Sequence, residues 1–492
     1  MPAFLRKSLN QVTMYRLMLY FLLVLLATAT FLSLIRILPY DPIDILLGGA
    51  FLVAISNLAN YLFSKLFKAK TNFESASITA LILSLIVGPF SFFESWPILA
   101  FIGFAAMASK YVFAFKKKHI FNPAATAVFL SAIIFQTGAS WWVGSLQLLP
   151  IIIVGGLLVL VKIKRFELIA SFLAVYFFTG LVGRGLGASS FLVPAIWFFV
   201  LVMLVEPLTS PSTKKRQMAF GAFVAIFYFS LQKFLPTFAY GLETSLLAGN
   251  IFSFFISPSF NLVLALRRRE KVAKDTWAFS FEPMSNFNFV PGQYLEWTYP
   301  HKNSDSKGVR RFFTISSSPA EDYVMVTLRA PTKKLSSFKK ALLEMKQGEQ
   351  IVASSPMGEF VLPEDKNIPL CFIAGGIGIT PFRSMAKHLL EKGEKRDIVL
   401  LYSNKKKAEI AFEELFDEAE EVGVKTFNII TERDGYIDEK MIAEKVPDYR
   451  ERAFYVSGPQ PMVEAFKKML SKMKVKSIET DFFPGYTDTH QK

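Results

Sequence analysis

Two glycine-rich stretches in the C-terminal half have residue types that can hold a nucleotide phosphate. The first, "CFIAGGIGITPFRS" (371–384), reads as an apolar strand, a glycine turn and the start of a helix. Free amides at such a helix start bind phosphate. We expect Thr380 to be the N-cap and Pro381 the first helical residue. The glycines of this turn are Gly375, Gly376 and Gly378. A tight turn without a ligand is the alternative, because Pro381 stands where the dinucleotide fingerprint has its third glycine.

The second stretch, "YVSGPQPM" (455–462), repeats the strand–turn–helix form around Ser457, Gly458 and Pro459. In a doubly wound sheet both turns face the crevice at the carboxyl ends of the strands. A further segment, "LYSNKKKAEIAF" (401–412), follows the strand beside which an adenosine ribose lies in such a sheet. Ser403 and its neighbouring lysines either accept a 2′-phosphate or form a solvated run. These residues therefore leave open whether the nucleotide carries a 2′-phosphate.

A third set of residues can bind a pyrophosphate. In "VRRFFTISSSP" (309–319), Arg311 offers a forked set of donors, and alternation along a strand puts Phe313 on its face and Thr314 on the other. Downstream, Ser336 and Ser337 precede an amphipathic segment, where they cap a helix or bind phosphate at its N-terminus. An edge strand with a basic end, followed by simple capping, is the alternative interpretation.

Cysteine and histidine counts exclude several redox centres. A single cysteine, Cys371, cannot supply the about four ligands of a self-contained iron–sulfur cluster. Of the four histidines only His119 lies in the apolar half, which excludes a haem held by paired histidines across the membrane. We find no nucleophile or metal-ligand set, so no catalytic residue beyond those that place a cofactor and no metal are predicted.

Four motifs in order resemble the ferredoxin–NADP reductase family over about residues 265–487. They are "PGQY" (291–294), "RRFFT" (310–314), "GGIGITP" (375–381) and "VSGPQPM" (456–462). The resemblance implies FAD across a β-barrel and NAD(P)H over a second domain. It implies that Arg311 meets the FAD pyrophosphate, Phe313 packs on the isoalloxazine, and Thr314 bonds near its reactive nitrogen.

The same resemblance implies the remaining contacts. Ser336 and Ser337 take the other phosphate contacts, and Phe483 in the tail "DFFPGY" covers the flavin ring. For NAD(P)H, the turn 375–381 supports the dinucleotide and Ser457 to Pro459 its nicotinamide side. The alternative interpretation of "DFFPGY" is that it only completes the last strand of the sheet.

The elements that must position these residues begin near Asn261. Strands come first, and strands alternating with helices follow after the polar turn "LPEDKNIP". We therefore predict a FAD-binding β-barrel domain over 261–365 and a doubly wound α/β NAD(P)-binding domain over 366–492.

Residues 1–260 are composed like a polytopic α-helical membrane domain. Hydrophobic residues make up 52% of the chain, and much of its +15 formal charge lies in short basic triplets between apolar runs. This placement follows the positive-inside rule and argues against nucleic acid as a partner. We predict ten spans, two of them short, with both termini cytoplasmic and the first span retained. They lie near 15–36, 45–64, 73–88, 92–114, 120–136, 146–161, 167–183, 190–206, 217–233 and 239–258.

Polar motifs interrupt this half at "HIFNPAATA" (119–127) and "VEPLTSPST" (205–213), either as helix caps or as the lining of a site. They resemble the D subunit of Rnf electron-transport complexes and the B subunit of the sodium-translocating NADH:quinone oxidoreductase. That family implies a flavin-carrying subunit of two five-helix halves in opposite orientation. Ser140 in "TGASWWVGS" stands where the family has its flavin-bearing Thr, which argues against covalent FMN. Non-covalent FMN or a quinone near Asn122, Ser140 and Glu206 stays open.

Together these features predict a membrane flavoprotein that takes hydride from NAD(P)H onto FAD. Electrons then pass to an acceptor in or at the membrane: a flavin, a quinone or a redox subunit. Ion coupling stays open, and lipid of a prokaryotic plasma membrane is the expected surrounding. The alternative is an ion transporter or channel whose reductase-like domain senses nucleotide.

Overall fold

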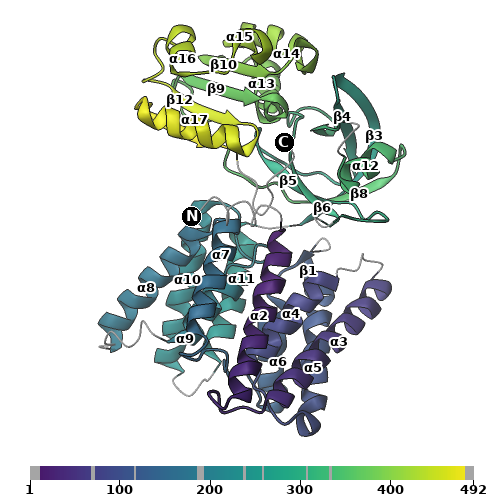
Figure 1. The fold of residues 1–492 in the computed structure, drawn as a ribbon, viewed down its shortest axis with the longest axis vertical. Coiled ribbons are helices and arrows are strands. Elements are labelled where there is room, and N and C mark those ends of the chain that lie inside the picture. Colours follow the sequence, from purple (N-terminus) through teal and green to yellow (C-terminus); the bar gives the residue numbers. More distant parts are fainter. Residues whose placement is uncertain are drawn as a thin grey trace. The chain divides into compact units, whose positions relative to one another are not determined.

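The computed structural model describes residues 12–67, 73–115, 118–184, 193–235, 240–257, 260–305, 308–331 and 335–481. The chain forms two compact units, Met1–Phe260 and Asn261–Lys492, each with its own internal packing (Figure 1). The division falls where spanning-length apolar runs give way to strands in the sequence.

Unit 1 is helical throughout its described length, apart from one short hairpin. Its elements are α2 (Met14–Leu34), α3 (Pro42–Leu66), α4 (Phe73–Ile86), α5 (Phe92–Val112), β1 (Ala114–Phe115), β2 (Lys118–His119), α6 (Pro123–Phe135), α7 (Leu149–Ile163), α8 (Phe166–Arg184), α9 (Pro194–Phe198), the π-helical turn η2 (Phe199–Met203), α10 (Lys214–Phe234) and α11 (Gly241–Ile256). Polar caps and prolines set several starts: Asp41 caps α3 and Asn122 caps α6, each with proline in the first turn.

The described helices of unit 1 form two sets that share part of a packing scheme. In α2–α6, the helix α3 packs on α5 and α4, α5 on α6, and α2 on α4. In α7–α11, α8 packs on α10, α10 on α11, and α7 on α9 and η2. The α3–α5, α5–α6 and α2–α4 contacts thus have counterparts in the second set, whereas the close α3–α4 contact has no comparable counterpart among the described helices.

The predicted number of spans is wrong for the part of the chain that the structure describes. Three helices, α2, α3 and α5, are long and apolar enough to cross a membrane by length and composition. Helices such as α4, α6 and α7 have 14, 13 and 15 residues. At about 1.5 Å per residue they are roughly 20–23 Å long, shorter than a hydrocarbon core of about 30 Å.

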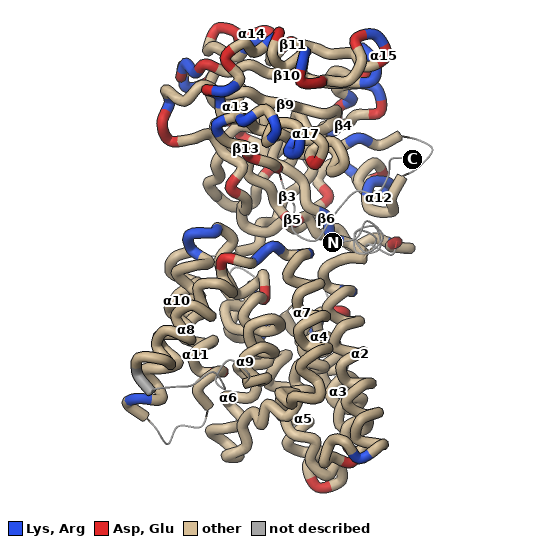
Figure 2. Tube along the Cα trace, turned by 60° about the vertical axis from the view of Figure 1, so that its left-hand side comes forward, with Lys and Arg blue, Asp and Glu red and all other residues tan. Residues whose placement is uncertain are grey.

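Charge is distributed differently in the two units. Along the described helices of unit 1, Lys, Arg, Asp and Glu gather at the ends and are sparse in the middle, whereas unit 2 carries both signs over its surface (Figure 2).

Unit 2 begins with a six-stranded antiparallel sheet in the order β6-β5-β8-β3-β4-β7. Its strands are β3 (Asn261–Ala273), β4 (Thr276–Pro283), β5 (Tyr294–Thr298), β6 (Arg310–Thr314), β7 (Val324–Arg329) and β8 (Gln350–Ser354), with helix α12 (Ser337–Glu344) between β7 and β8. Phe279, Phe281 and Trp297 fill its interior and are almost fully buried. This sheet is the predicted barrel.

A parallel sheet in the order β11-β10-β9-β12-β13 follows. Its elements are β9 (Leu370–Gly375), the 3₁₀ turn η3 (Gly376–Ile379), α13 (Thr380–Lys392), β10 (Ile398–Asn404), η4 (Lys407–Glu409), α14 (Glu413–Glu418), η5 (Ala419–Val422), β11 (Val424–Ile430), α15 (Thr431–Asp434), α16 (Glu439–Lys445), β12 (Ala453–Ser457), α17 (Gln460–Lys472) and β13 (Ser477–Thr480). Separate apolar clusters cover the two faces of the sheet, one around α13 and one around α17. This is a doubly wound sheet, and its strand order reverses between β9 and β12.

Candidate functional site

The two glycine turns meet at this switch point. Strands β9 and β12 are neighbours, so the turns that follow them lie side by side. A methyl group on Gly378 would lie 2.3 Å from the carbonyl oxygen of Ser457, and one on Gly375 would lie 2.1 Å from the sulfur of Met462. Gly378 is therefore required by the close packing of one turn on the backbone of the other, whereas a methyl group on Gly375 would meet the movable end of a methionine side chain.

Gly376 differs from its neighbours. Its φ is +53°, a left-handed value that favours glycine, and nothing lies within 4 Å of the position where a Cβ would be. Gly376 lines an open pocket between the carboxyl ends of β9 and β10 and the barrel. The lining residues are Thr276, Arg329, Gly376, Ile377, Ile379, Tyr402, Asn404, Glu409 and Ala411.

Asn404 is the most informative residue of this pocket, and the sequence analysis missed it. It is 3% exposed, yet among the residues that the structure describes neither atom of its side-chain amide meets a partner with hydrogen-bond geometry. The Tyr402 hydroxyl lies nearby but without hydrogen-bond geometry toward the amide. A buried amide without partners is costly unless a ligand or water completes it. The predicted neighbour Ser403 does not line the pocket, although both residues end the same strand.

The start of α13 differs from the prediction. Thr380 is the first helical residue instead of the N-cap, because η3 runs directly into α13 and leaves no extended capping residue. Its hydroxyl donates to the Ile377 carbonyl at 3.2 Å. Pro381 is the second helical residue, one position later in the helix than predicted, and still lies in the first turn. At the second turn, Pro459 precedes α17, and the Ser457 hydroxyl donates to Asp481 at 3.1 Å.

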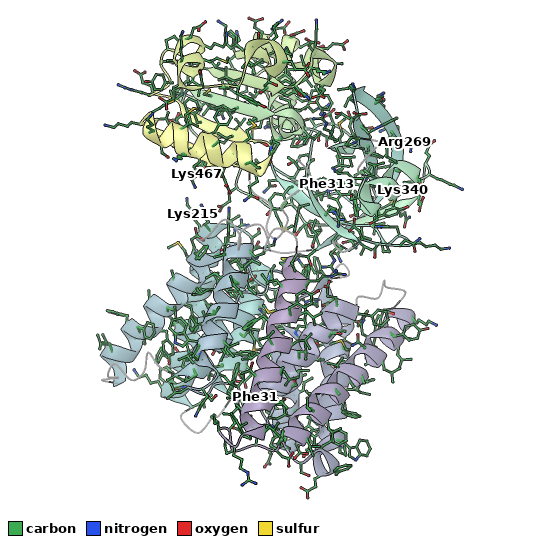
Figure 3. The ribbon with its side chains drawn as sticks, in the orientation of Figure 1. Phe31, Lys215, Arg269, Phe313, Lys340 and Lys467 are labelled. Carbon is green, nitrogen blue, oxygen red and sulfur yellow. The ribbon has the colours of Figure 1, made fainter. Side chains whose placement is uncertain are left out.

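On the barrel, Arg311 and Phe313 share one face of β6. The Arg311 guanidinium lies 5.4 Å from the ring centre of Phe338, and the rings of Phe313 and Phe338 are 5.9 Å apart. Arg311 and Thr314 are buried, whereas Phe313 is half-buried. Figure 3 shows Phe313 among the side chains of the barrel. The predicted alternation is confirmed, and a partly open aromatic face beside a buried cation suits a ring bearing a phosphate tail.

The Asp305 carboxylate links Arg311 to the start of α12. The Asp305 side chain accepts from Arg311 Nη2 at 3.0 and 3.3 Å and from the Ser337 amide at 3.1 Å. Ser336 is the N-cap, and its hydroxyl accepts from the Lys339 amide at 3.3 Å. A guanidinium and a helix-start amide thus converge on one anionic group, which is the donor set that a pyrophosphate requires. The barrel residues therefore fit FAD.

A buried ion pair joins the barrel to the nucleotide domain. Arg383 on α13 forms two hydrogen bonds with Glu321, one of 2.9 Å, and also donates to the Ser316 carbonyl at 2.9 Å. Both side chains are less than 10% exposed. Burial alone raises the pKa of Glu321, but the hydrogen bonds and charge of Arg383 outweigh it and hold that pKa below its ordinary value.

In unit 1 the predicted flavin or quinone site consisted of Asn122, Ser140 and Glu206, and the structure brings Asn122 and Glu206 together. The Asn122 amide donates to Glu206 at 2.7 Å, and its backbone N–H donates to Asn250 at 2.8 Å. Ser140 instead donates to the Ile86 carbonyl at 3.3 Å. Ser140 follows the C-terminal end of α6, whereas Asn122 caps its N-terminal end. Phe483 lies outside the described residues. Within the described ranges, no group of His, Cys, Asp or Glu is placed to hold a metal ion.

An antiparallel barrel with an anion-binding arginine, followed by a doubly wound sheet with two glycine turns at its switch point, defines a flavin- and pyridine nucleotide-dependent reductase module. Comparison with known proteins agrees. Residues 372–468 match the oxidoreductase NAD-binding domain family.

The curated relatives include flavohemoproteins and reductase subunits. A flavohemoprotein of Oceanobacillus iheyensis is 26% identical over 226 residues, which are 42% of this chain and 55% of the relative. The glycine betaine monooxygenase reductase subunit of Pseudomonas aeruginosa is 30% identical over 226 residues, 42% of this chain and 60% of the relative. Among solved structures, the Amycolatopsis cytochrome P450 reductase GcoB has a TM-score of 0.41 at 23% identity, covering 46% of this chain and 70% of its own.

The chain spans little more than half the length of the first of these curated relatives. Unit 2 is a ferredoxin reductase-like oxidoreductase module that binds FAD and NAD(P)H.

Proposed function

We propose that the whole chain is a membrane-bound NAD(P)H oxidoreductase whose unit 2 delivers electrons to an acceptor in or at unit 1. The observation that carries the proposal is the pairing, within unit 2, of the Arg311 anion site on the barrel with the Gly376 pocket at the switch point. The first suits a flavin pyrophosphate and the second a pyridine nucleotide.

The residues of unit 2 act by binding and placement. Bound FAD supplies the capacity to accept hydride from NAD(P)H and to release electrons one at a time. Arg311 and the amide of Ser337 hold its phosphates, and Phe313 offers an aromatic face to its ring. Gly376 and Asn404 line the nucleotide pocket. The Arg383–Glu321 pair fixes α13, and with it the glycine turn, to the barrel.

Apolar exposure supports the membrane part of the proposal. Large hydrophobic side chains project from the helices of unit 1, and Figure 3 labels Phe31 among them. Phe31 is 58% exposed, Phe178 69% and Phe255 76%. Water does not tolerate contiguous apolar surface on this scale, whereas lipid does. We place unit 1 in a prokaryotic plasma membrane, with unit 2 and both termini on the cytoplasmic side.

The contacts that α2–α6 and α7–α11 have in common support the further proposal of an Rnf D- or NADH:quinone oxidoreductase B-like membrane unit. The acceptor is then non-covalent FMN or a quinone near Asn122 and Glu206, or a partner redox subunit. Relatives named as a flavohemoprotein and as a monooxygenase reductase subunit favour a redox acceptor of some kind.

Arg311→Ala tests the flavin step. Without the guanidinium, the purified full chain should lose most of its bound FAD. Its rate of NAD(P)H oxidation with an artificial acceptor should fall at least tenfold. Flavin released on denaturation and the oxidation rate measure the two effects. Arg267→Ala is the matched control, because Arg267 pairs with exposed Asp322 on the same barrel. Normal flavin content in the Arg311 variant would contradict the assignment.

A second candidate function, an ion transporter with a nucleotide-sensing domain, is favoured by one observation in unit 1. Glu206 lies in a polar cluster with Asn122, Thr209 and His119, at the end of α6. Buried carboxylates at membrane depth often line ion paths. The Arg311→Ala variant distinguishes the two functions. If the chain is a transporter, the variant should keep its ion flux in liposomes. If ion flux is coupled to NAD(P)H oxidation, the flux should stop when flavin binding is lost.

A further inference from the structure

Asp305 lies in the anion site of the barrel, and no family motif in the sequence includes it. Its carboxylate pairs in bidentate fashion with Arg311 Nη2 and also accepts from the Ser337 amide. Its own backbone N–H donates to the Ser337 hydroxyl at 2.9 Å. One aspartate is thus joined by four hydrogen bonds to two of the residues assigned to the FAD phosphates.

Arg311 is held in place independently of Asp305. Its Nη1 donates to the carbonyls of Gly308 and Arg310 at 3.0 and 2.7 Å, and its side chain is 9% exposed. The Asp305 side chain is 31% exposed, so it can turn toward solvent while Arg311 stays where it is. The fixed partner is the cation, and the movable partner is the carboxylate.

A carboxylate and a phosphate present the same oxygen acceptors to a guanidinium fork and to a helix-start amide. They cannot occupy the same donors together, because like charges in one partly buried site repel. Any pyrophosphate that reaches Arg311 and Ser337 must therefore displace Asp305.

We propose that Asp305 is a tethered anion that competes with the FAD pyrophosphate and so lowers the flavin affinity of unit 2. The inference rests on the proposed flavin site. Asp305 determines affinity by occupying Arg311, and it has no part in the redox step itself. The flavin-free module is stabilised by the Asp305 contacts, and FAD binding exchanges them for phosphate contacts.

The test compares flavin affinities of the full chain and its Asp305→Asn variant. Asparagine keeps an acceptor for the Ser337 amide but removes the charge that pairs with Arg311. After removal of bound flavin, titration with FAD followed by fluorescence quenching should give a Kd lower by about two- to fivefold in the variant, the range expected for a partly exposed ion pair. Riboflavin, which has no phosphate, should bind both proteins equally.

Two variants make the result specific. Asp322→Asn removes an exposed carboxylate that pairs with Arg267 at 2.8 Å and should leave the FAD Kd unchanged. In an Arg311→Ala background, Asp305→Asn should no longer strengthen FAD binding, because the competition is for Arg311. The flavin-free Asp305→Asn protein should also melt at a lower temperature than the flavin-free parent.

Several outcomes would overturn the proposal. An unchanged or weaker FAD affinity in Asp305→Asn would show that Asp305 does not compete, while FAD binding by the parent chain leaves the proposed function intact. An equal gain for riboflavin would show that the effect does not involve the phosphates. If neither protein binds FAD, the proposed function fails as well.

Discussion

At the scale of single residues, the pocket at the ends of β9 and β10 depends on one buried amide. Among the described residues, the Asn404 side chain meets no partner with hydrogen-bond geometry although it is almost inaccessible to solvent. A residue selected only for stability would not leave four hydrogen-bonding positions unused at this depth. The residue is better explained by a nucleotide that completes its hydrogen bonds.

Asn404→Ala should therefore separate binding from folding. The variant should raise the KM for NAD(P)H by about tenfold, the cost of one lost hydrogen bond in a buried site. Its free energy of unfolding should change by less than about 1 kcal/mol, because the amide bonds no residue that the structure describes. Steady-state kinetics and urea unfolding measure the two quantities. A large loss of stability with an unchanged KM would make Asn404 a packing residue.

The sequence predicted residues whose role depends on their immediate neighbours. Alternation along β6 predicted the shared face of Arg311 and Phe313, and the serines before α12 predicted a cap. Asp305 was not predicted, because its importance comes from contacts with Arg311 and Ser337, and Asn404 was not predicted, because burial of its amide without a partner is visible only in the fold. The pair Asp305–Ser337 spans 32 residues, and no local pattern indicates it.

At the scale of elements, the position of the nucleotide turn depends on the pair between α13 and the barrel. Removing one partner of a buried ion pair leaves the other charge without compensation. Glu321→Ala should lower the free energy of unfolding of the module by roughly 3 kcal/mol. The neighbouring Asp322→Ala should cost less than about 1 kcal/mol, because that carboxylate pairs at the surface. Equal effects of the two changes would contradict the role of Glu321.

The same pair predicts how stability depends on pH. The pKa of Glu321 is lower in the folded chain than its ordinary value of 4.5, through its bonds to Arg383. The contribution of Glu321 to the free energy of unfolding is therefore complete above about pH 4.5. It is lost as the pH falls through the pKa that Glu321 has in the folded chain. The stability difference between the parent chain and Glu321→Gln should shrink over that acid range and stay constant from pH 6 to 8. A difference that grows in acid would reverse the assigned sign.

The contact between the two glycine turns can be tested with a pair of substitutions. Gly378→Ala places a methyl group against the Ser457 carbonyl and should destabilise the module by about 2–3 kcal/mol. Gly376→Ala meets no atom and should cost only about 1 kcal/mol, for its left-handed φ. Thermal unfolding of both variants measures the difference. Similar melting temperatures would mean that the turns do not pack on each other as described.

The elements themselves were predictable where their hydrophobic pattern was strong. The alternation of strands and helices predicted after "LPEDKNIP" is present as β9, α13, β10, α14, β11, α16, β12 and α17. The segment between β10 and β11 is broken into the short helical segments η4, α14 and η5. In unit 1, composition indicated apolar helices, but the number of spans was wrong because apolar runs do not reveal where helices end inside a packed unit.

At the scale of the whole molecule, two units of different chemistry share one chain. Unit 2 has the folded parts of a flavin reductase, and unit 1 has an apolar, partly exposed surface with charge at the helix ends. A reductase module needs an acceptor, and the sequence has neither the cysteines of a self-contained iron–sulfur cluster nor a pair of histidines in its apolar half for a haem across the membrane. We therefore propose that the next electron carrier lies in or at unit 1 or on a partner.

The most direct test of this claim is the redox behaviour of the purified full chain in lipid nanodiscs. We predict bound FAD whose absorbance bleaches on anaerobic addition of NAD(P)H and recovers when a quinone is added. The protein should also contain either one flavin, or FAD and a second flavin held without a covalent bond. A chain that carries no flavin, or whose flavin NAD(P)H does not reduce, would contradict the account.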